Sequence, residues 1–72
     1  MAGKKVRTKF LSVVVPAYKA EKFIAKDLIR IKEVLDEIKY DYEIICVVDG
    51  NIDRTFDEAK KIALKHPRKI KV

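Results

Sequence analysis

Two short polar loops contain the residues of this sequence whose types and spacing could do chemistry. Residues 16–21 (PAYKAE) follow the apolar run 11–15, and residues 49–55 (DGNIDRT) follow the apolar run 44–48. Each loop stands where a strand-like run gives way to a helix-like one. Ligands of open parallel α/β sheets bind at the carboxyl ends of the strands. The two loops together therefore indicate a ligand site.

The second loop offers the clearest binding group, the carboxylate of Asp49. A carboxylate at a strand end can accept two hydrogen bonds at once, and charge-assisted bonds are roughly twice as strong as neutral ones. Gly50 would let the backbone turn sharply beside it. Simpler interpretations stay open, because Asp-Gly is also a common turn pair. Tyr18 would then pack or turn, Glu21 would favour a helix N-terminus, and Asp53 would tie the loop before the next helix.

The periodicity of the apolar residues predicts the elements that position these loops. Residues 11–15 are apolar on both faces, as in a buried parallel strand, and Pro16 is expected to end that strand. From residue 21 to about 39 the apolar side chains recur at steps of three and four, which predicts an amphipathic helix. That stripe comprises Ile24, Leu28, Ile31, Leu35 and Ile38, widened by Phe23 and Val34.

A second strand, a second helix and a third strand are predicted in the same way. Residues 44–48 form the second apolar run. Thr55 with Glu58 three residues later makes a capping box, which indicates that a helix begins there. Pro67 should end that helix at residue 66, and residues 68–72 alternate basic and apolar side chains like an edge strand.

This order, β-α-β-α-β, predicts an α/β fold with a three-stranded parallel sheet, a Rossmann-like half domain. Two right-handed crossovers in one direction place both helices on the same face of the sheet. Yet both faces of the sheet are apolar, because Val13 and Val15 point opposite to Val14. We therefore expect the second face to be covered by a missing C-terminal half or by another copy in a homo-oligomer, or else by a crystal neighbour.

Composition limits the class of protein. The 72 residues, 49% hydrophobic, suffice for one small domain, and no apolar run approaches the roughly 20 residues of a membrane span. We expect a basic flexible arm at residues 1–9, no signal peptide and a cytoplasmic location. The lone Cys46 should be an inert buried thiol, and the abundance of Lys, Glu, Ile and Val is typical of hyperthermophiles.

The net charge of +6 could attract nucleic acid phosphates. The basic residues gather at the two ends of the chain, but no aromatic residues are interleaved with them. No helix-turn-helix, zinc or RNA-binding motif accompanies them either. A solvated basic surface is the favoured interpretation, and nucleic acid is not expected as a partner.

The order LSVVVPAYxxE (residues 11–21) and then YEIICVVDGxxDxT (residues 42–55) resembles the start of a family 2 glycosyltransferase. These GT-A fold enzymes use nucleotide-sugars, and the resemblance is nearest to the polyprenyl-phosphate, dolichyl-phosphate mannose synthase-like branch. It implies that residues 10–72 are a partial nucleotide-binding domain for a UDP- or GDP-sugar. It also implies that Asp49 accepts hydrogen bonds from the base or ribose, with the pocket lined by Pro16, Ala17, Tyr18, Glu21 and Gly50.

Several positions differ from the family pattern. The family usually has Asn, a helix-capping residue, at the position of Lys19, a second acid at Val48 and often Gly at Arg54. Its metal-binding DxD motif, general base and acceptor site match nothing in this sequence. The resemblance thus implies Mg²⁺ or Mn²⁺ for the intact enzyme, whereas we expect no catalytic residue, metal ligand or sugar transfer in this chain alone. The alternative is a small non-enzymatic domain that self-associates through its exposed sheet face.

Overall fold

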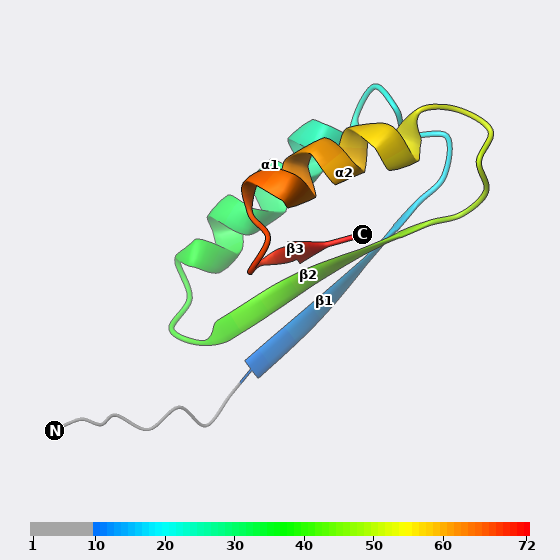
Figure 1. Cartoon of the computed structure of the whole chain (residues 1–72). Coiled ribbons are helices and arrows are strands. Elements are labelled where there is room, and N and C mark those ends of the chain that lie inside the picture. The colour runs from blue at the N-terminus through cyan, green and yellow to red at the C-terminus, as the bar shows by residue number, and fades with distance from the viewer. Residues whose placement is uncertain (1–9) are drawn as a thin grey trace, which may run out of the picture.

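The structure is a computed structural model, and it describes residues 10–72. Five elements follow one another in the predicted order (Figure 1). They are β1 (Phe10–Ala17), α1 (Ile24–Asp36), β2 (Asp41–Val48), α2 (Thr55–Lys65) and β3 (Ile70–Lys71). The basic arm predicted for residues 1–9 lies outside the described part of the chain. Within residues 10–72 no helix is long and apolar enough to cross a membrane.

The three strands form one parallel sheet in the order β1-β2-β3. β1 pairs with β2 along its whole length, from Phe10 opposite Asp41 to Ala17 opposite Val48. β3 pairs with β2 where Ile70 lies opposite Ile44. Both helices lie on the same face of this sheet (Figure 1). The α/β fold, the parallel topology and the one-sided helices are thus confirmed.

The core fills the space between the sheet and the two helices. Alternate residues of β2 point into it, and Ile44 and Cys46 are at most 2% exposed. Leu28 of α1 and Ala59 of α2 are fully buried against them. Burying a Leu or Ile side chain contributes about 1.5–3 kcal/mol, so this single apolar layer supplies most of the stability that orients the loops.

The opposite face of the sheet is open within the described residues. Val14 of β1 is 58% exposed and Val47 of β2 is 50% exposed. Further along this face, Ser12 donates a hydrogen bond to Glu43 at 2.6 Å, and Lys71 lies 3.7 Å from the same carboxylate. The uncovered apolar face that the alternation predicts is therefore present in the structure.

Helix α1 is shorter than its periodicity predicts, since it begins at Ile24 rather than at residue 21 and ends at Asp36 rather than near residue 39. Residues 21–23 form a turn instead, and Lys19 just before it has a left-handed backbone, with φ of 49°. The carbonyl of Ala20 then accepts the N–H groups of both Phe23 and Ile24 in a tight turn. Phe23 is consequently 62% exposed and does not widen the buried stripe.

The far end of α1 also departs from expectation. Val34 is 61% exposed and lies off the buried stripe. Beyond the helix, the phenol of Tyr42 donates a hydrogen bond to Asp36, which ties the end of α1 to the start of β2. Lys32 reaches the same carboxylate at 2.9 Å. These contacts fix the turn that the helical pattern alone would have extended through.

Pro16 does not end β1, because the strand continues to Ala17 with Pro16 opposite Val47. Proline is tolerated in an edge strand, where its missing N–H can face away from the neighbouring strand. Within the described residues β1 has a neighbour, β2, on one side alone. The expectation was wrong because the sequence does not reveal which strand lies at an edge.

Candidate functional site

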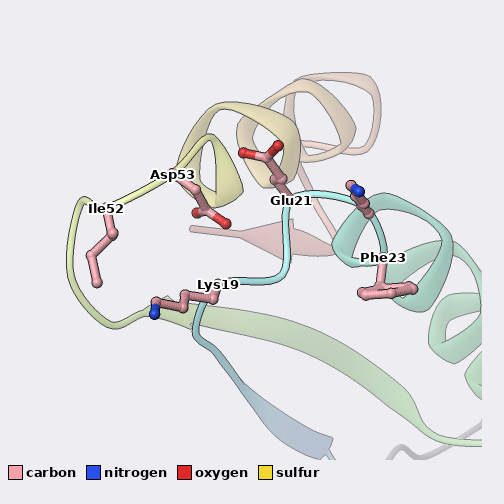
Figure 2. A pocket seen from close by; sticks show the side chains of 6 residues that line it. Lys19, Glu21, Phe23, Ile52 and Asp53 are labelled. Atoms are coloured by element: carbon pink, nitrogen blue, oxygen red, sulfur yellow. The ribbon is translucent and has the colours of Figure 1, made fainter.

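The carboxyl ends of β1 and β2 bring the two polar loops side by side, as parallel pairing requires (Figure 2). The β1–α1 loop spans residues 18–23 and the β2–α2 loop spans residues 49–54. Their junction begins where the N–H of Asp49 donates to the carbonyl of Ala17 at 2.8 Å, which extends the ladder beyond the end of β2. The two loops thus form one continuous edge.

The six residues expected to line the site all lie at this edge or one residue below it. Pro16 is exposed on the open face, whereas Ala17 is buried beneath the loops. Tyr18 is 55% exposed at the tip of the first loop, and Asp49 is exposed at the start of the second. Gly50 has φ of +84°, so the predicted sharp turn is confirmed. The sixth residue, Glu21, is half-buried between the loops.

Thr55 joins the two loops through its side-chain hydroxyl. The residue is 1% exposed and opens α2. Its hydroxyl accepts a hydrogen bond from the N–H of Ala20 at 2.7 Å and donates one to Asp53 at 2.5 Å. Thr55 therefore does not cap α2 by the predicted capping box. The helix has Arg54 at its cap position and no side-chain bond from that residue.

The carboxylates of Glu21 and Asp53 satisfy backbone N–H groups at the start of α2 instead. Oε1 of Glu21 accepts from the N–H of Arg54 at 2.9 Å, and Oδ1 of Asp53 accepts from the N–H of Thr55 at 2.9 Å. The bonds from the hydroxyl and the N–H of Thr55 hold the pKa of Asp53 below its usual value. The charged form of Asp53 is thereby favoured, which also suits the positive end of the helix dipole.

An open pocket of about 290 Å³ lies beside this junction. It is lined by Lys19, Glu21, Lys22, Phe23, Ile52 and Asp53. Of the six residues expected from the sequence, Glu21 alone lines this pocket. In Figure 2 the labelled Glu21 and Asp53 extend from opposite loops toward one another, Phe23 stands at the α1 side and Ile52 at the β2–α2 side.

The residues that sequence reasoning missed combine charge with exposed apolar surface. Phe23 and Ile52 are 62% and 63% exposed. The ammonium of Lys19 lies 5.6 Å from the centroid of the Tyr18 ring. The predicted parallel pairing of the two strands could have indicated these residues, because it places residues 19–23 beside residues 52–53.

Residues 12–72 match the family described as "Glycosyl transferase family 2". The chain belongs to glycosyltransferase family 2. Two relatives agree with this. The "Uncharacterized glycosyltransferase YkcC" of Bacillus subtilis (strain 168) is 40% identical over 57 residues, which is 79% of this chain and 18% of that protein. The "Uncharacterized glycosyltransferase sll0501" of Synechocystis sp. is 44% identical over 48 residues, 67% of this chain and 15% of that protein.

The family 2 match thus concerns one part of longer proteins, since the aligned segment spans less than a fifth of either relative's length. No solved structure is significantly similar to the chain. The family is therefore established by sequence, and the arrangement of the loops by the structure described above.

The described residues offer neither a metal-binding cluster nor a reactive thiol. Within residues 10–72 no group of three or more His, Cys, Asp or Glu side chains is placed to hold a metal ion. The described residues therefore do not fit the divalent cation that the family resemblance implies. Cys46 is buried and free, and burial raises the pKa of its thiol. A thiol in that state is a poor nucleophile.

Proposed function

We propose that this chain is the N-terminal, nucleotide-sugar-binding part of a family 2 glycosyltransferase. The observation that carries the proposal is the fused edge of the two loops, with the exposed Asp49 beside the left-handed Gly50. Ligands of open parallel α/β sheets bind at this edge. Family membership supports a nucleotide-sugar as the donor.

Within this site Asp49 is the proposed anchor. Its carboxylate is exposed and can accept two donors at once, such as the N–H groups of a base or the hydroxyls of a ribose. The ring of Tyr18 is exposed on the facing loop and offers a surface against which a base can stack. Pro16, Ala17 and Gly50 shape the floor and wall of the site, and Glu21 stands at its inner side.

The donor proposed is a UDP- or GDP-sugar, and a polyprenyl phosphate is the proposed acceptor of the whole enzyme, as in the dolichyl-phosphate mannose synthase-like branch. Because residues 10–72 do not fit a metal ion, no step assigned to this chain passes through one. The chain's part in transfer is to bind and orient the nucleotide. We propose that it does not transfer sugar by itself.

Titration of the chain with UDP and GDP tests the proposal by NMR. We expect millimolar or tighter binding that shifts the amide signals of Tyr18, Asp49 and Gly50, while the amides around β3 stay unchanged. Asp49→Asn should weaken binding about tenfold, because it replaces a charge-assisted bond by a neutral one. Asp57→Asn, a change at an exposed acid in α2, is the matched control and should leave affinity unaltered.

Absence of any shift at millimolar UDP and GDP would contradict nucleotide binding by this chain. Equal affinity in Asp49→Asn and the unaltered chain would contradict the role of Asp49 while leaving the nucleotide site in place.

A second candidate, self-association, is favoured by the open sheet face. Val14 and Val47 are at least half exposed there, and the adjoining Glu43 and Lys71 give the face one acid and one base. A second copy laid on this face would cover the apolar strip and could pair opposite charges. Sedimentation should then show a dimer that Val14→Lys converts to monomer. A concentration-independent monomer would exclude this candidate.

A further inference from the structure

We infer that Glu21 and Thr55 are positioning residues that lock the two loops together, so that Tyr18 and Asp49 face the same nucleotide. This inference rests on the proposed function. It assigns to both side chains a role through the backbone of the opposite loop, not a contact with ligand. Glu21 lines the pocket beside the junction, and its carboxylate is also bonded to the backbone of the opposite loop.

The hydroxyl of Thr55 both accepts and donates a hydrogen bond. It accepts from the N–H of Ala20 in the first loop and donates to Asp53 in the second, and the residue is 1% exposed. Ala20 in turn supports the turn that leads into helix α1, because its carbonyl accepts the N–H groups of Phe23 and Ile24. One buried hydroxyl thereby links the start of α1 to the start of α2.

Glu21 makes the reciprocal connection. Its Oε1 accepts from the N–H of Arg54, a residue 33 positions away in the sequence. The first N–H groups of a helix have no hydrogen-bond acceptor within the helix. Here the carboxylate of Glu21, from the other loop, is the acceptor for the N–H of Arg54. Together with the bond from Asp49 to Ala17, the loops are joined at the end of the strands and again at the start of the helices.

Between these two connections lie the loop tips, whose backbone needs such support. Lys19 and Gly50 both have positive φ, at 49° and 84°. Short polar segments with few buried contacts open easily. A loop that is already held in its bound shape loses less conformational freedom when ligand binds. The long-range bonds of Glu21 and Thr55 are therefore suited to preorganise the tips that carry Tyr18 and Asp49.

Four variants separate positioning from general structure. Thr55→Val keeps the shape of the buried side chain but removes its hydroxyl, and Thr55→Ser keeps the hydroxyl. Glu21→Ala removes the acceptor for Arg54, and Glu21→Gln keeps an acceptor oxygen. Two readouts are needed for each: amide hydrogen exchange in the free chain, and affinity for UDP and GDP.

We expect Thr55→Val to speed exchange of the Ala20 amide, and Glu21→Ala that of the Arg54 amide, each by about tenfold. The amides of β2 should exchange as before, which shows that the fold is intact. Affinity for the nucleotide should fall about tenfold in these two variants. Thr55→Ser and Glu21→Gln should restore both readouts to near the level of the unaltered chain.

The outcomes distinguish this inference from the function on which it rests. If the unaltered chain binds neither UDP nor GDP, the proposed function fails and the positioning role fails with it. If it binds but Thr55→Val and Glu21→Ala bind equally well, the positioning role alone is overturned. Unchanged exchange of the Ala20 and Arg54 amides would overturn the connection between the loops directly.

Discussion

Replacement of Tyr42 by Phe should reduce the stability of this chain at neutral pH and increase it near pH 12. Tyr42 is 4% exposed and its phenol donates to Asp36. Burial, followed by that hydrogen bond, raises the pKa of Tyr42 to about 12. Hydrogen bonds from Tyr42 and then from Lys32 lower the pKa of Asp36. The fold thus favours a protonated phenol beside an ionised carboxylate.

The sign of the effect follows from the raised pKa. Unfolded Tyr42 ionises at its ordinary value of 10.0, whereas the folded residue ionises near pH 12. Its contribution to stability is therefore fully present below pH 10 and is lost as the pH rises toward 12. One pKa unit corresponds to about 1.4 kcal/mol, so the free energy of unfolding should fall by about 2 kcal/mol at pH 12.

Tyr42→Phe removes both the hydrogen bond to Asp36 and the ionisable phenol. At pH 7 it loses one hydrogen bond to an exposed carboxylate, which costs about 1 kcal/mol. Near pH 12 it escapes the larger loss, so the two stability curves should cross near pH 11. The ammonium of Lys69 lies 4.4 Å from the centroid of the Tyr42 ring. It attracts a phenolate and so reduces the loss of stability of the unaltered chain at high pH. About 2 kcal/mol is thus an upper value for this single ionisation.

Urea unfolding followed by circular dichroism at pH 7, 9, 11 and 12 measures the difference. Tyr40→Phe is the matched control, since Tyr40 is 44% exposed and its loss should change stability by less than about 0.5 kcal/mol. If the difference in the free energy of unfolding between the unaltered chain and Tyr42→Phe stays constant from pH 7 to pH 12, the reasoning is refuted.

Three further substitutions test the backbone and the core by thermal unfolding. Lys19→Asn should raise stability by about 0.5–1 kcal/mol, because Asn tolerates the left-handed backbone better, while Lys22→Asn should not; equal effects would contradict strain at Lys19. Gly50→Ala should cost about 1–2 kcal/mol from its φ of +84° alone, since the added Cβ would meet Ile52 at an ordinary 3.6 Å; a neutral result would contradict this. Leu28→Ala should cost about 2–5 kcal/mol and Val34→Ala far less, and comparable losses would contradict the assigned core.

The fold was predictable because its signals are local and repeated. Apolar runs such as residues 44–48 predict buried strands, and helical periodicity from Ile24 to Leu35 predicts α1. The chirality of β-α-β connections then decides on which face the helices lie. The same reasoning predicted an uncovered face, and the exposure of Val14 confirms it.

The limits of the elements were less predictable because they depend on contacts between distant residues. Periodicity extended α1 in both directions, yet a turn held by the carbonyl of Ala20 precedes its start and the bond from Tyr42 to Asp36 marks its end. Thr55 illustrates the same point at the site. Its spacing from Glu58 fits a capping box, but its hydroxyl is used by Ala20 and Asp53 instead.

The family and the position of the candidate site were determined by the sequence itself, since both follow from residue types in order: an apolar run, a Pro-containing loop, a second apolar run and Asp49-Gly50. Which side chains of the two loops are exposed and which form bonds between the loops was decided by the tertiary structure. Glu21 and Arg54 are 33 positions apart, and only parallel pairing of β1 with β2 brings them within hydrogen-bonding distance. A sequence pattern records neighbours along the chain, whereas this junction exists between loops that the sheet brings together.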